Sequence, residues 1–193
     1  MTTSNSAAAQ PFLTDIKELR RRSREHLDQG AVTENYEIDP KQAVDLLQNA
    51  LATEIVCVLR YTMHAISATG IASDGPREEF EQHANDERAH MRLIAERINQ
   101  LGGTPNLSPE GLASRSATEY GPTDLNLVGM LRENLVAERI AIEHYRELIR
   151  FFGQKDSTTR IMLEGILAQE EDHANDMHDL LVAHEGKPNL PRS

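Results

Sequence analysis

Two copies of one sparse pattern of glutamate and histidine run through this 193-residue chain. Each copy is a lone glutamate followed by a Glu-x-x-His pair, 33 positions later in the first copy and 32 in the second. The six residues are, in chain order, Glu54, Glu87, His90, Glu138, Glu170 and His173. Four carboxylates and two imidazoles form a ligand set suited to two hard or borderline divalent metal ions, whose charge the four glutamates would balance. The pattern therefore indicates dinuclear metal chemistry.

The glutamates of this pattern fall on the apolar faces of helical segments. Around them, apolar residues recur at alternating intervals of three and four, which is the spacing of helices packed in a bundle. Glu54, for example, lies between Leu51 and Val58 on such a stripe. Four carboxylates buried together without partners would destabilise the fold through desolvation and repulsion, and metal ions remove that cost. We therefore expect the four side chains to point inward and to bind metal.

The Glu-x-x-His spacing has a geometric reason. Residues at i and i+3 are neighbours on a helix surface, so the glutamate can bridge two metals while the histidine binds one of them. This arrangement is known in di-iron carboxylate bundles. The same periodicity assigns Glu170 to the site rather than Glu171, which lies off the stripe. One such pair occurs by chance in many acidic helices, whereas six phased residues in four segments favour a metal site.

Other residues near the pattern have two readings. Tyr61 lies seven positions after Glu54 on the same face, where its phenol could hydrogen-bond a ligand, supply an electron or simply pack in the core. His83 lies one turn before Glu87 and could touch the margin of the site or a path by which metal reaches it. Packing or surface roles are expected for Cys57, His64 and His144.

Four long amphipathic segments are predicted to carry these residues. They run from Asp39-Pro40 to near Gly70, from Ser73-Asp74 to Gly102, from Pro122 to Gly153, and from about Asp156 to Gly186. Short turns join the first to the second and the third to the fourth, whereas the Gly-, Pro- and Ser-rich stretch after Gly102 predicts a long crossover along the bundle. We predict an all-α, antiparallel four-helix bundle at residues 39–185. An N-terminal extension at 1–38, with a short helix within 12–29, precedes it, and a tail at 186–193 follows it.

Composition narrows the class of protein. The chain is 39% hydrophobic and 26% charged, which is typical of a soluble helical protein, and we expect no membrane span because its apolar runs are short. The first ten residues lack the basic and apolar regions of a secretory signal, so a cytoplasmic location is expected. The single cysteine excludes an internal disulfide. A net charge of -11 disfavours broad attraction to nucleic acid and favours cations.

The sequence around the six residues resembles the ferritin superfamily, most closely the bacterioferritins and bacterioferritin-like, Dps-like cage proteins. The resemblance covers about residues 40–183. It is carried by the stretch from Ala52 through Glu54 to Tyr61, by Glu87-Arg-Ala-His90, by Leu135-Val-Ala-Glu138 and by Ala168-Gln-Glu170-Glu-Asp-His173. It implies a ferritin-like fold and a ferroxidase that oxidises Fe(II) with O2 or H2O2 at two iron positions and stores ferric mineral in a shell. In that comparison Glu54 and His90 would bind one iron, Glu138 and His173 the other, and Glu87 and Glu170 would bridge them.

Three departures from the resembled families matter. Bacterioferritins have a haem-binding methionine where this chain has Arg88, so no haem is expected. Thioferritins of the Dps-like group carry a cysteine pair near the site, where this chain has Arg139-Ile140 and Thr159-Arg160. Ferritins of 24 subunits usually add a fifth helix, for which the C-terminal stretch is too short and too rich in proline. A homo-oligomeric cage of 12 subunits is therefore favoured, with 24 as the alternative.

Other functions remain open on the sequence alone. The same ligands serve other dinuclear peroxidases and catalases, with Mn or Zn as substitutes for Fe. A DNA-binding protein that protects against oxidative stress is a further alternative, because Lys17 and four nearby arginines lie in the N-terminal extension. Acidic residues are interleaved with these cations, as on an ordinary solvated helix face, so DNA binding is the weaker reading.

Overall fold

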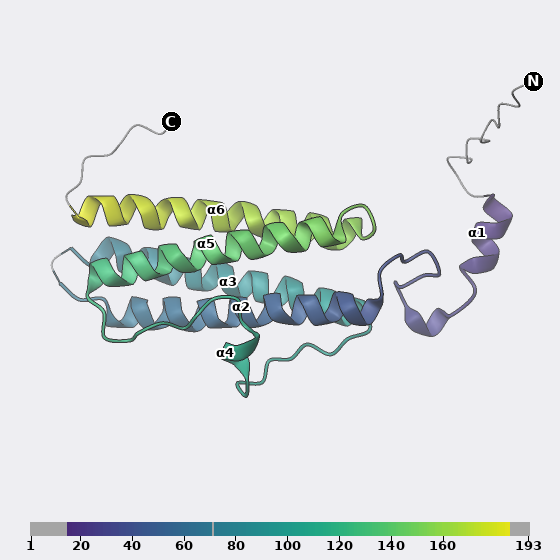
Figure 1. The fold of residues 1–193 in the computed structure, drawn as a ribbon, viewed down its shortest axis with the longest axis horizontal. Helices are drawn as coiled ribbons and strands as arrows, with labels where there is room; N and C mark the ends of the chain where they lie inside the picture. The colour runs from purple at the N-terminus through teal and green to yellow at the C-terminus, as the bar shows by residue number, and fades with distance from the viewer. Residues whose placement is uncertain (1–14, 71, 186–193) are drawn as a thin grey trace, which may run out of the picture.

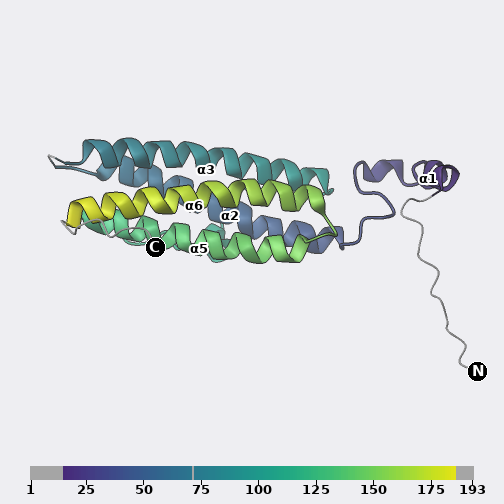
Figure 2. The same ribbon diagram turned by 90° about the horizontal axis from the view of Figure 1, so that it is seen from above.

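The computed structural model describes residues 15–70 and 72–185, and these fold into helices joined by loops. The elements are α1 (Ile16–Arg22), a 3-10 turn (Leu27–Gln29), α2 (Pro40–Ser67), α3 (Asp74–Gln100), α4 (Leu112–Arg115), α5 (Leu127–Phe152) and α6 (Ser157–Glu185). Figures 1 and 2 show α2, α3, α5 and α6 lying side by side as a bundle. The predicted all-α, four-helix architecture is confirmed. The expected tail at 186–193 lies outside the described residues.

The helix ends follow from capping chemistry. The Asp39 side chain accepts a hydrogen bond from the Lys41 backbone N–H at 3.0 Å, and Pro40 supplies the first helical residue of α2. The third long helix begins at Leu127, later than the Pro122 predicted, because Asn126 provides its cap. The Asn126 side chain accepts from the Gly129 N–H at 2.8 Å. At the other end of α5, Gly153 has a φ of 44°, a left-handed conformation that favours glycine and stops the helix.

Two apolar clusters fill the bundle on either side of its middle. One contains buried residues of the first half of α2 with the ends of α3 and α5, including Leu47, Ile94 and Phe152. The other contains buried residues of the second half of α2 with the start of α3, including Cys57 and Phe80. The acidic and histidine residues of the repeated pattern lie between these clusters, at mid-height of the bundle.

The predicted crossover is present. Residues 101–126 connect α3 to α5 along the outside of α2, with the short α4 midway (Figure 1). Leu112 of α4 packs against Ala52 and Val56, and the Thr53 hydroxyl accepts a hydrogen bond from the Ala117 backbone N–H at 2.9 Å. The crossover therefore covers the part of α2 that carries Glu54.

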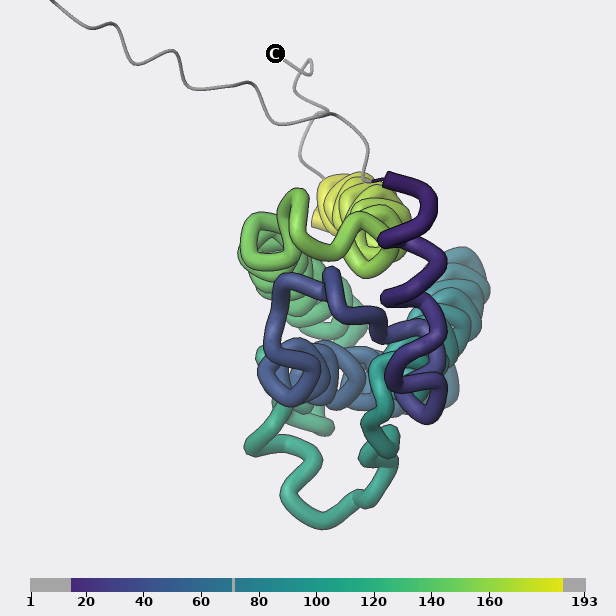
Figure 3. Tube along the Cα trace, turned by 90° about the vertical axis from the view of Figure 1, so that its right-hand side faces the viewer, coloured from purple at the N-terminus to yellow at the C-terminus, as the bar shows by residue number. Residues whose placement is uncertain are grey.

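The N-terminal extension contains one short α-helix, α1, within the range where a short helix was expected. Figures 1 and 2 place α1 beyond one end of the bundle, and Figure 3 views the molecule from that end. The helix stops at Arg22, and His26, with a φ of 53°, separates it from the 3-10 turn. The apolar side chains of Ile16, Leu19 and Leu27 are 64%, 52% and 76% exposed. With so little apolar contact, a longer helix here would gain little stability.

The apolar character of α2 comes from the core of the bundle. Among the described residues, α2 alone is long and apolar enough to cross a bilayer by length and composition, and half of its apolar window is buried within the protein. Its buried side chains also include Glu54 and Arg60. Core helices of bundles commonly have this composition.

Candidate metal centre

The six residues of the repeated pattern meet inside the bundle. Glu54 comes from α2, Glu87 and His90 from α3, Glu138 from α5, and Glu170 and His173 from α6. Their exposed fractions range from 0% to 4%. All six side chains therefore point into the bundle, as predicted. Their ability to bind metal depends on the distances between their ligand atoms.

The six residues form two overlapping groups of possible ligands. Within each group, one ligand atom per residue lies within 4.8 Å of the others. The first group is Glu54, Glu87, His90 and Glu170, and the second is Glu87, Glu138, Glu170 and His173. Glu87 and Glu170 belong to both groups. This sharing is what two adjacent ions with two bridging carboxylates require.

Distances around the two histidines describe the space between the ligands. The Nδ1 atom of His90 lies 3.0 Å from Glu170, 3.2 Å from Glu87 and 3.4 Å from Glu54. The Nδ1 atom of His173 lies 3.5 Å from Glu87 and 3.6 Å from Glu170. The same ring nitrogen of each histidine thus faces the carboxylates and could bind metal.

Many polar atoms of the cluster have no hydrogen-bond partner in the described chain. These atoms are Oε2 of Glu54, Oε1 of Glu87, Oε2 of Glu138, both carboxylate oxygens of Glu170 and Nδ1 of His173. Leaving a buried polar group unsatisfied costs about 1–3 kcal/mol, and more when it is charged. Metal ions bound between these atoms would satisfy them, so the residues present fit a dinuclear metal site.

The protonation of the metal-free cluster reflects its burial and crowding. Burial, with repulsion from Glu170, raises the pKa of both Glu87 and Glu138 well above the usual value. Burial also acts to raise the pKa of Glu170, but contacts with His173 and His90 outweigh it and lower that pKa to about 2. Without metal, burial and crowding therefore favour the protonated forms of Glu87 and Glu138 and the ionised form of Glu170.

The histidines complete this balance of charge. Burial alone favours the neutral rings, yet contacts with the surrounding carboxylates, Glu170 first among them, raise the pKa of His90 and of His173. Divalent cations would take over the role of these protons, because a metal-binding imidazole must be neutral and a metal-binding carboxylate ionised.

Two tyrosines bond the outer glutamates, Glu54 and Glu138, which each belong to only one of the two ligand groups. Each tyrosine comes from the helix that carries the other glutamate. The Tyr61 hydroxyl of α2 donates to Oε1 of Glu138 on α5, and the Tyr145 hydroxyl of α5 donates to Oε1 of Glu54 on α2. Both phenols are buried. Sequence reasoning singled out Tyr61 but not Tyr145. The signal was available, since both tyrosines follow their glutamates by seven positions.

The outer nitrogen of each histidine also has a crosswise partner that sequence reasoning missed. The Nε2 atom of His90 donates to Oε1 of Gln169 at 2.9 Å, and Nε2 of His173 lies 3.5 Å from Oδ2 of Asp86. Gln169 and Asp86 each directly precede a bridging-position glutamate. Such partners fix the ring orientation of a metal-binding histidine. The two halves differ, because one partner is a neutral amide and the other a carboxylate.

His83 lies at the margin of the cluster. Its ring stacks on that of His173, with centroids 3.9 Å apart, and meets the edge of Tyr61 at 5.1 Å. One of its nitrogens, one of His173 and an oxygen of Glu138 lie within 4.8 Å of one another. Burial, helped by the charge of His173, lowers the pKa of His83 to about 3, so the ring is neutral.

The remaining singled-out residues belong to neither of the two overlapping ligand groups. Glu171 is on the surface and pairs with Arg146 at 2.9 Å, which agrees with the choice of Glu170. Cys57 is buried, with Sγ 3.7 Å from the Thr118 hydroxyl of the crossover. His64 is also buried and contacts Asn134, while His144 is half-buried beside the Tyr145 ring.

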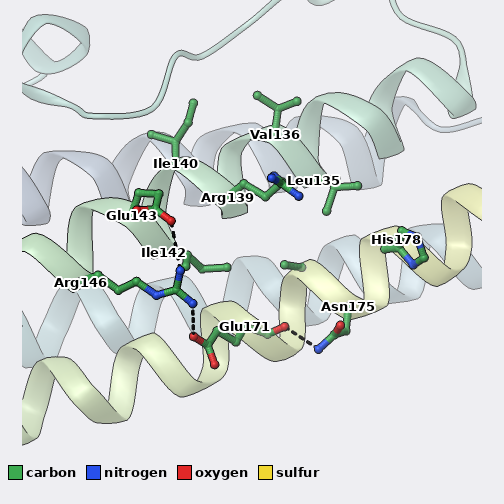
Figure 4. Close-up of a pocket in the computed structure, with 11 residues that line it drawn as sticks. Leu135, Val136, Arg139, Ile140, Ile142, Glu143, Arg146, Glu171, Asn175 and His178 are labelled. Atoms are coloured by element: carbon green, nitrogen blue, oxygen red, sulfur yellow. Dashed lines mark hydrogen bonds and ion pairs between the residues drawn. The ribbon is translucent and has the colours of Figure 1, made fainter. Parts of the chain in front are cut away.

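A shallow groove between α5 and α6 is separate from the centre. Figure 4 shows this groove, which has a volume of about 890 Å³. Its lining combines apolar side chains with the Arg146 ion pairs to Glu143 and Glu171, at 3.1 and 2.9 Å. It includes Arg139 and Ile140 but none of the six residues of the repeated pattern.

Known proteins match this chain in sequence and in fold. The ferritin-like domain model matches residues 44–185. A dodecameric thioferritin, the bacterioferritin-related protein of Bacteroides fragilis, is 36% identical, with a TM-score of 0.74 over 77% of this chain and 89% of that structure. A DNA protection during starvation protein of Pyrococcus furiosus is 29% identical over 78% of this chain and 81% of its own length. A bacterioferritin of Mycobacterium leprae is 28% identical over 66% and 76%. The chain therefore belongs to the ferritin-like family.

Proposed function

We propose that this protein is a ferroxidase that removes Fe(II) and stores iron. The observation that carries the proposal is the pair of overlapping ligand groups, in which Glu87 and Glu170 are shared. Membership of the ferritin-like family supports iron as the metal. Two ferrous ions held there would supply the electrons that reduce O2 or H2O2. In this proposal iron is the substrate, and the stored ferric mineral is the product.

The side chains would prepare the site for metal in three ways. The apolar clusters on either side exclude water and strengthen each electrostatic contact in the centre. Tyr61 and Tyr145 hold Glu138 and Glu54 in place from the opposite helices. Gln169 and Asp86 orient the rings of His90 and His173. Of these groups, Tyr61 is the one proposed to have a redox or hydrogen-bonding role during oxidation.

The site assignment is tested by removing a shared glutamate. Glu87→Ala and Glu170→Ala should each abolish the fast absorbance rise of ferric species after Fe(II) is mixed with oxygenated buffer, while leaving the native mass unchanged. Glu171→Ala is the matched control, because that side chain is one position away and lies on the surface. Oxidation by both shared-glutamate variants at the wild-type rate would refute the assignment.

The proposed assembly is a homo-oligomeric cage. The thioferritin relative is described as dodecameric, and 12 subunits are proposed here, with 24 as the alternative. This chain has one cysteine, Cys57, so it lacks the cysteine pair expected of thioferritins. Native mass measurement together with elemental analysis gives the subunit number and separates an iron protein from a manganese or zinc enzyme of the same fold. A monomer, or a protein isolated with manganese alone, would contradict the storage proposal.

DNA protection is the second candidate, because a DNA protection protein is among the relatives. In α1, however, Arg21 pairs with Glu18 at 2.8 Å and with Glu25 at 2.6 Å, which reduces its availability for phosphate. A gel-shift titration across salt concentrations tests this second candidate. Retardation at low salt that weakens steeply with added salt supports DNA binding, whereas its absence at low salt removes the candidate.

A further inference from the structure

A second cluster of possible metal ligands lies beside the dinuclear centre. Nε2 of His83 on α3 is 3.2 Å from Oε1 of Glu79, one turn earlier on the same helix. It is also 3.7 Å from Oδ2 of Asp176 on α6. The ligand atoms of these three residues lie within 4.8 Å of one another. None of the three belongs to the six-residue pattern.

His83 is the feature that separates this cluster from an ordinary acidic patch. Its side chain is 1% exposed, and neither ring nitrogen has a hydrogen-bond partner in the described chain. Stacking on His173 and contact with the edge of Tyr61 fix the ring, so the orphaned nitrogen stays directed at the two carboxylates. A buried imidazole without a partner is costly, which indicates that something else completes its coordination.

A small cavity brings this cluster into contact with solvent. It has a volume of about 190 Å³ and is lined by side chains of α3 and α6, among them Glu79, Asp86, Asp172 and Asp176. His83 and His173 form its inner wall. Four acidic side chains around one opening attract cations, and the opening leads to a ligand of the dinuclear centre.

We propose that Glu79, His83 and Asp176 form a third, mononuclear site for a divalent transition-metal ion at the mouth of this cavity, between α3 and α6. One imidazole nitrogen with two carboxylate oxygens suits borderline ions such as Fe(II) or Zn(II). The side chains of Glu79 and Asp176 are 36% and 52% exposed, so water completes the coordination and the ion exchanges readily.

The position of His83 gives this site a role in loading. The same residue belongs to the outer ligand group and to an inner group with Glu138 and His173. An ion held at the mouth would therefore be bound by a histidine that also lies beside Glu138 and His173, two candidate ligands of the dinuclear centre. This role rests on the proposed ferroxidase function, whereas the existence of the third site does not.

Zn(II) is the probe, because it is redox-inert and binds the same donor atoms. Crystals of the full-length protein soaked in Zn(II) should show a zinc anomalous peak among Glu79, His83 and Asp176. The double variant Glu79→Gln with Asp176→Asn should lose this peak and keep its fold, because both side chains reach the surface. Asp172→Asn is the matched control, since it removes one charge from the same cavity without removing a ligand, and it should keep the peak.

The outcomes separate this proposal from the proposed function. Absence of a peak at the mouth in the wild-type protein, or its persistence in the double variant, overturns the third site. Failure of the dinuclear centre would instead appear as missing peaks among the six inner residues while the outer peak remains. The loading role predicts that the double variant fills the inner site with Fe(II) more slowly at low iron concentration. An unchanged filling rate would refute that role.

Discussion

At the scale of single residues, the centre is built from two halves with corresponding contacts. Each outer glutamate is held by a tyrosine from the helix that carries the other one: Tyr145 holds Glu54, and Tyr61 holds Glu138. Each histidine is oriented by the residue that precedes the bridging-position glutamate of the other half. The repeated sequence pattern therefore corresponds to a repeated set of contacts. In each contact, a residue of one half positions a candidate ligand of the other half.

The tyrosine contacts predict a specific defect. Tyr61→Phe and Tyr145→Phe should each weaken Zn(II) binding by about 10–100-fold, as is usual when a group that orients a metal ligand is lost. Competition with a coloured chelator measures the affinity. Tyr36→Phe is the control, because its hydroxyl bonds Asp156 at 2.8 Å, away from the centre. Wild-type affinity in both site variants would show that the phenols do not position the glutamates.

Sequence reasoning could predict the inner residues but not all of their supports. The six ligand candidates were identifiable because charged residues on apolar stripes are rare, and the structure brings all six together. Tyr145 looked like core, since a tyrosine on an apolar stripe carries no sign of the carboxylate that it will meet. Gln169 and Asp86 were missed because their contacts join α3 to α6, and sequence spacing within one helix does not report such contacts.

At the scale of elements, a buried ion pair fixes the end of the bundle nearest α1. Asp156 accepts hydrogen bonds from Arg97 of α3 at 3.0 Å and from the Thr159 backbone N–H at 2.9 Å, which caps α6. The Tyr36 hydroxyl donates to the same carboxylate. One side chain thus joins the extension, the end of α3 and the start of α6.

Removing this carboxylate should destabilise the subunit. Asp156→Ala leaves buried Arg97 without its partner, which costs about 3 kcal/mol in comparable buried pairs. The free energy of unfolding, measured by chemical denaturation of the metal-free protein, should fall accordingly. Asp45→Ala is the control, since it removes only the exposed ion pair with Lys41 and should cause little change. Equal stability of the two variants would contradict this account.

The predicted elements were accurate where capping and periodicity agree and less accurate elsewhere. Asp39-Pro40 and Gly153 are local signals, and they mark the ends of α2 and α5 in the structure. The start of α5 was placed too early because Pro122 is also compatible with a loop. In the extension only a short helix was expected, and α1 stays short because it lacks a packed face.

At the scale of the whole molecule, metal binding and proton binding compete. In the metal-free protein the pKa values of Glu87, Glu138, His90 and His173 are all raised, for the reasons of burial and crowding given above. The folded state therefore holds more protons than the unfolded chain above neutral pH, where unfolded glutamates and histidines have released theirs. Stability of the metal-free protein must then fall as pH rises.

The raised pKa values predict a measurable pH dependence of stability. Between pH 7 and 8.5 the melting temperature of the metal-free protein should fall, whereas the increase caused by Zn(II) should grow, because bound metal needs the ligands deprotonated. Glu170 does not alter the trend, since its lowered pKa leaves it ionised throughout this range in both states. Scanning calorimetry with and without Zn(II) measures both effects. A metal-free melting temperature that rises over this interval would contradict the proposed charge balance.

Iron-edge anomalous diffraction from crystals soaked anaerobically in Fe(II) tests the central claim most directly. The account predicts two peaks among the six inner residues of each subunit, one among Glu54, Glu87, His90 and Glu170 and one among Glu87, Glu138, Glu170 and His173. A map without paired peaks among these six side chains, in a protein that still takes up iron, would contradict the account.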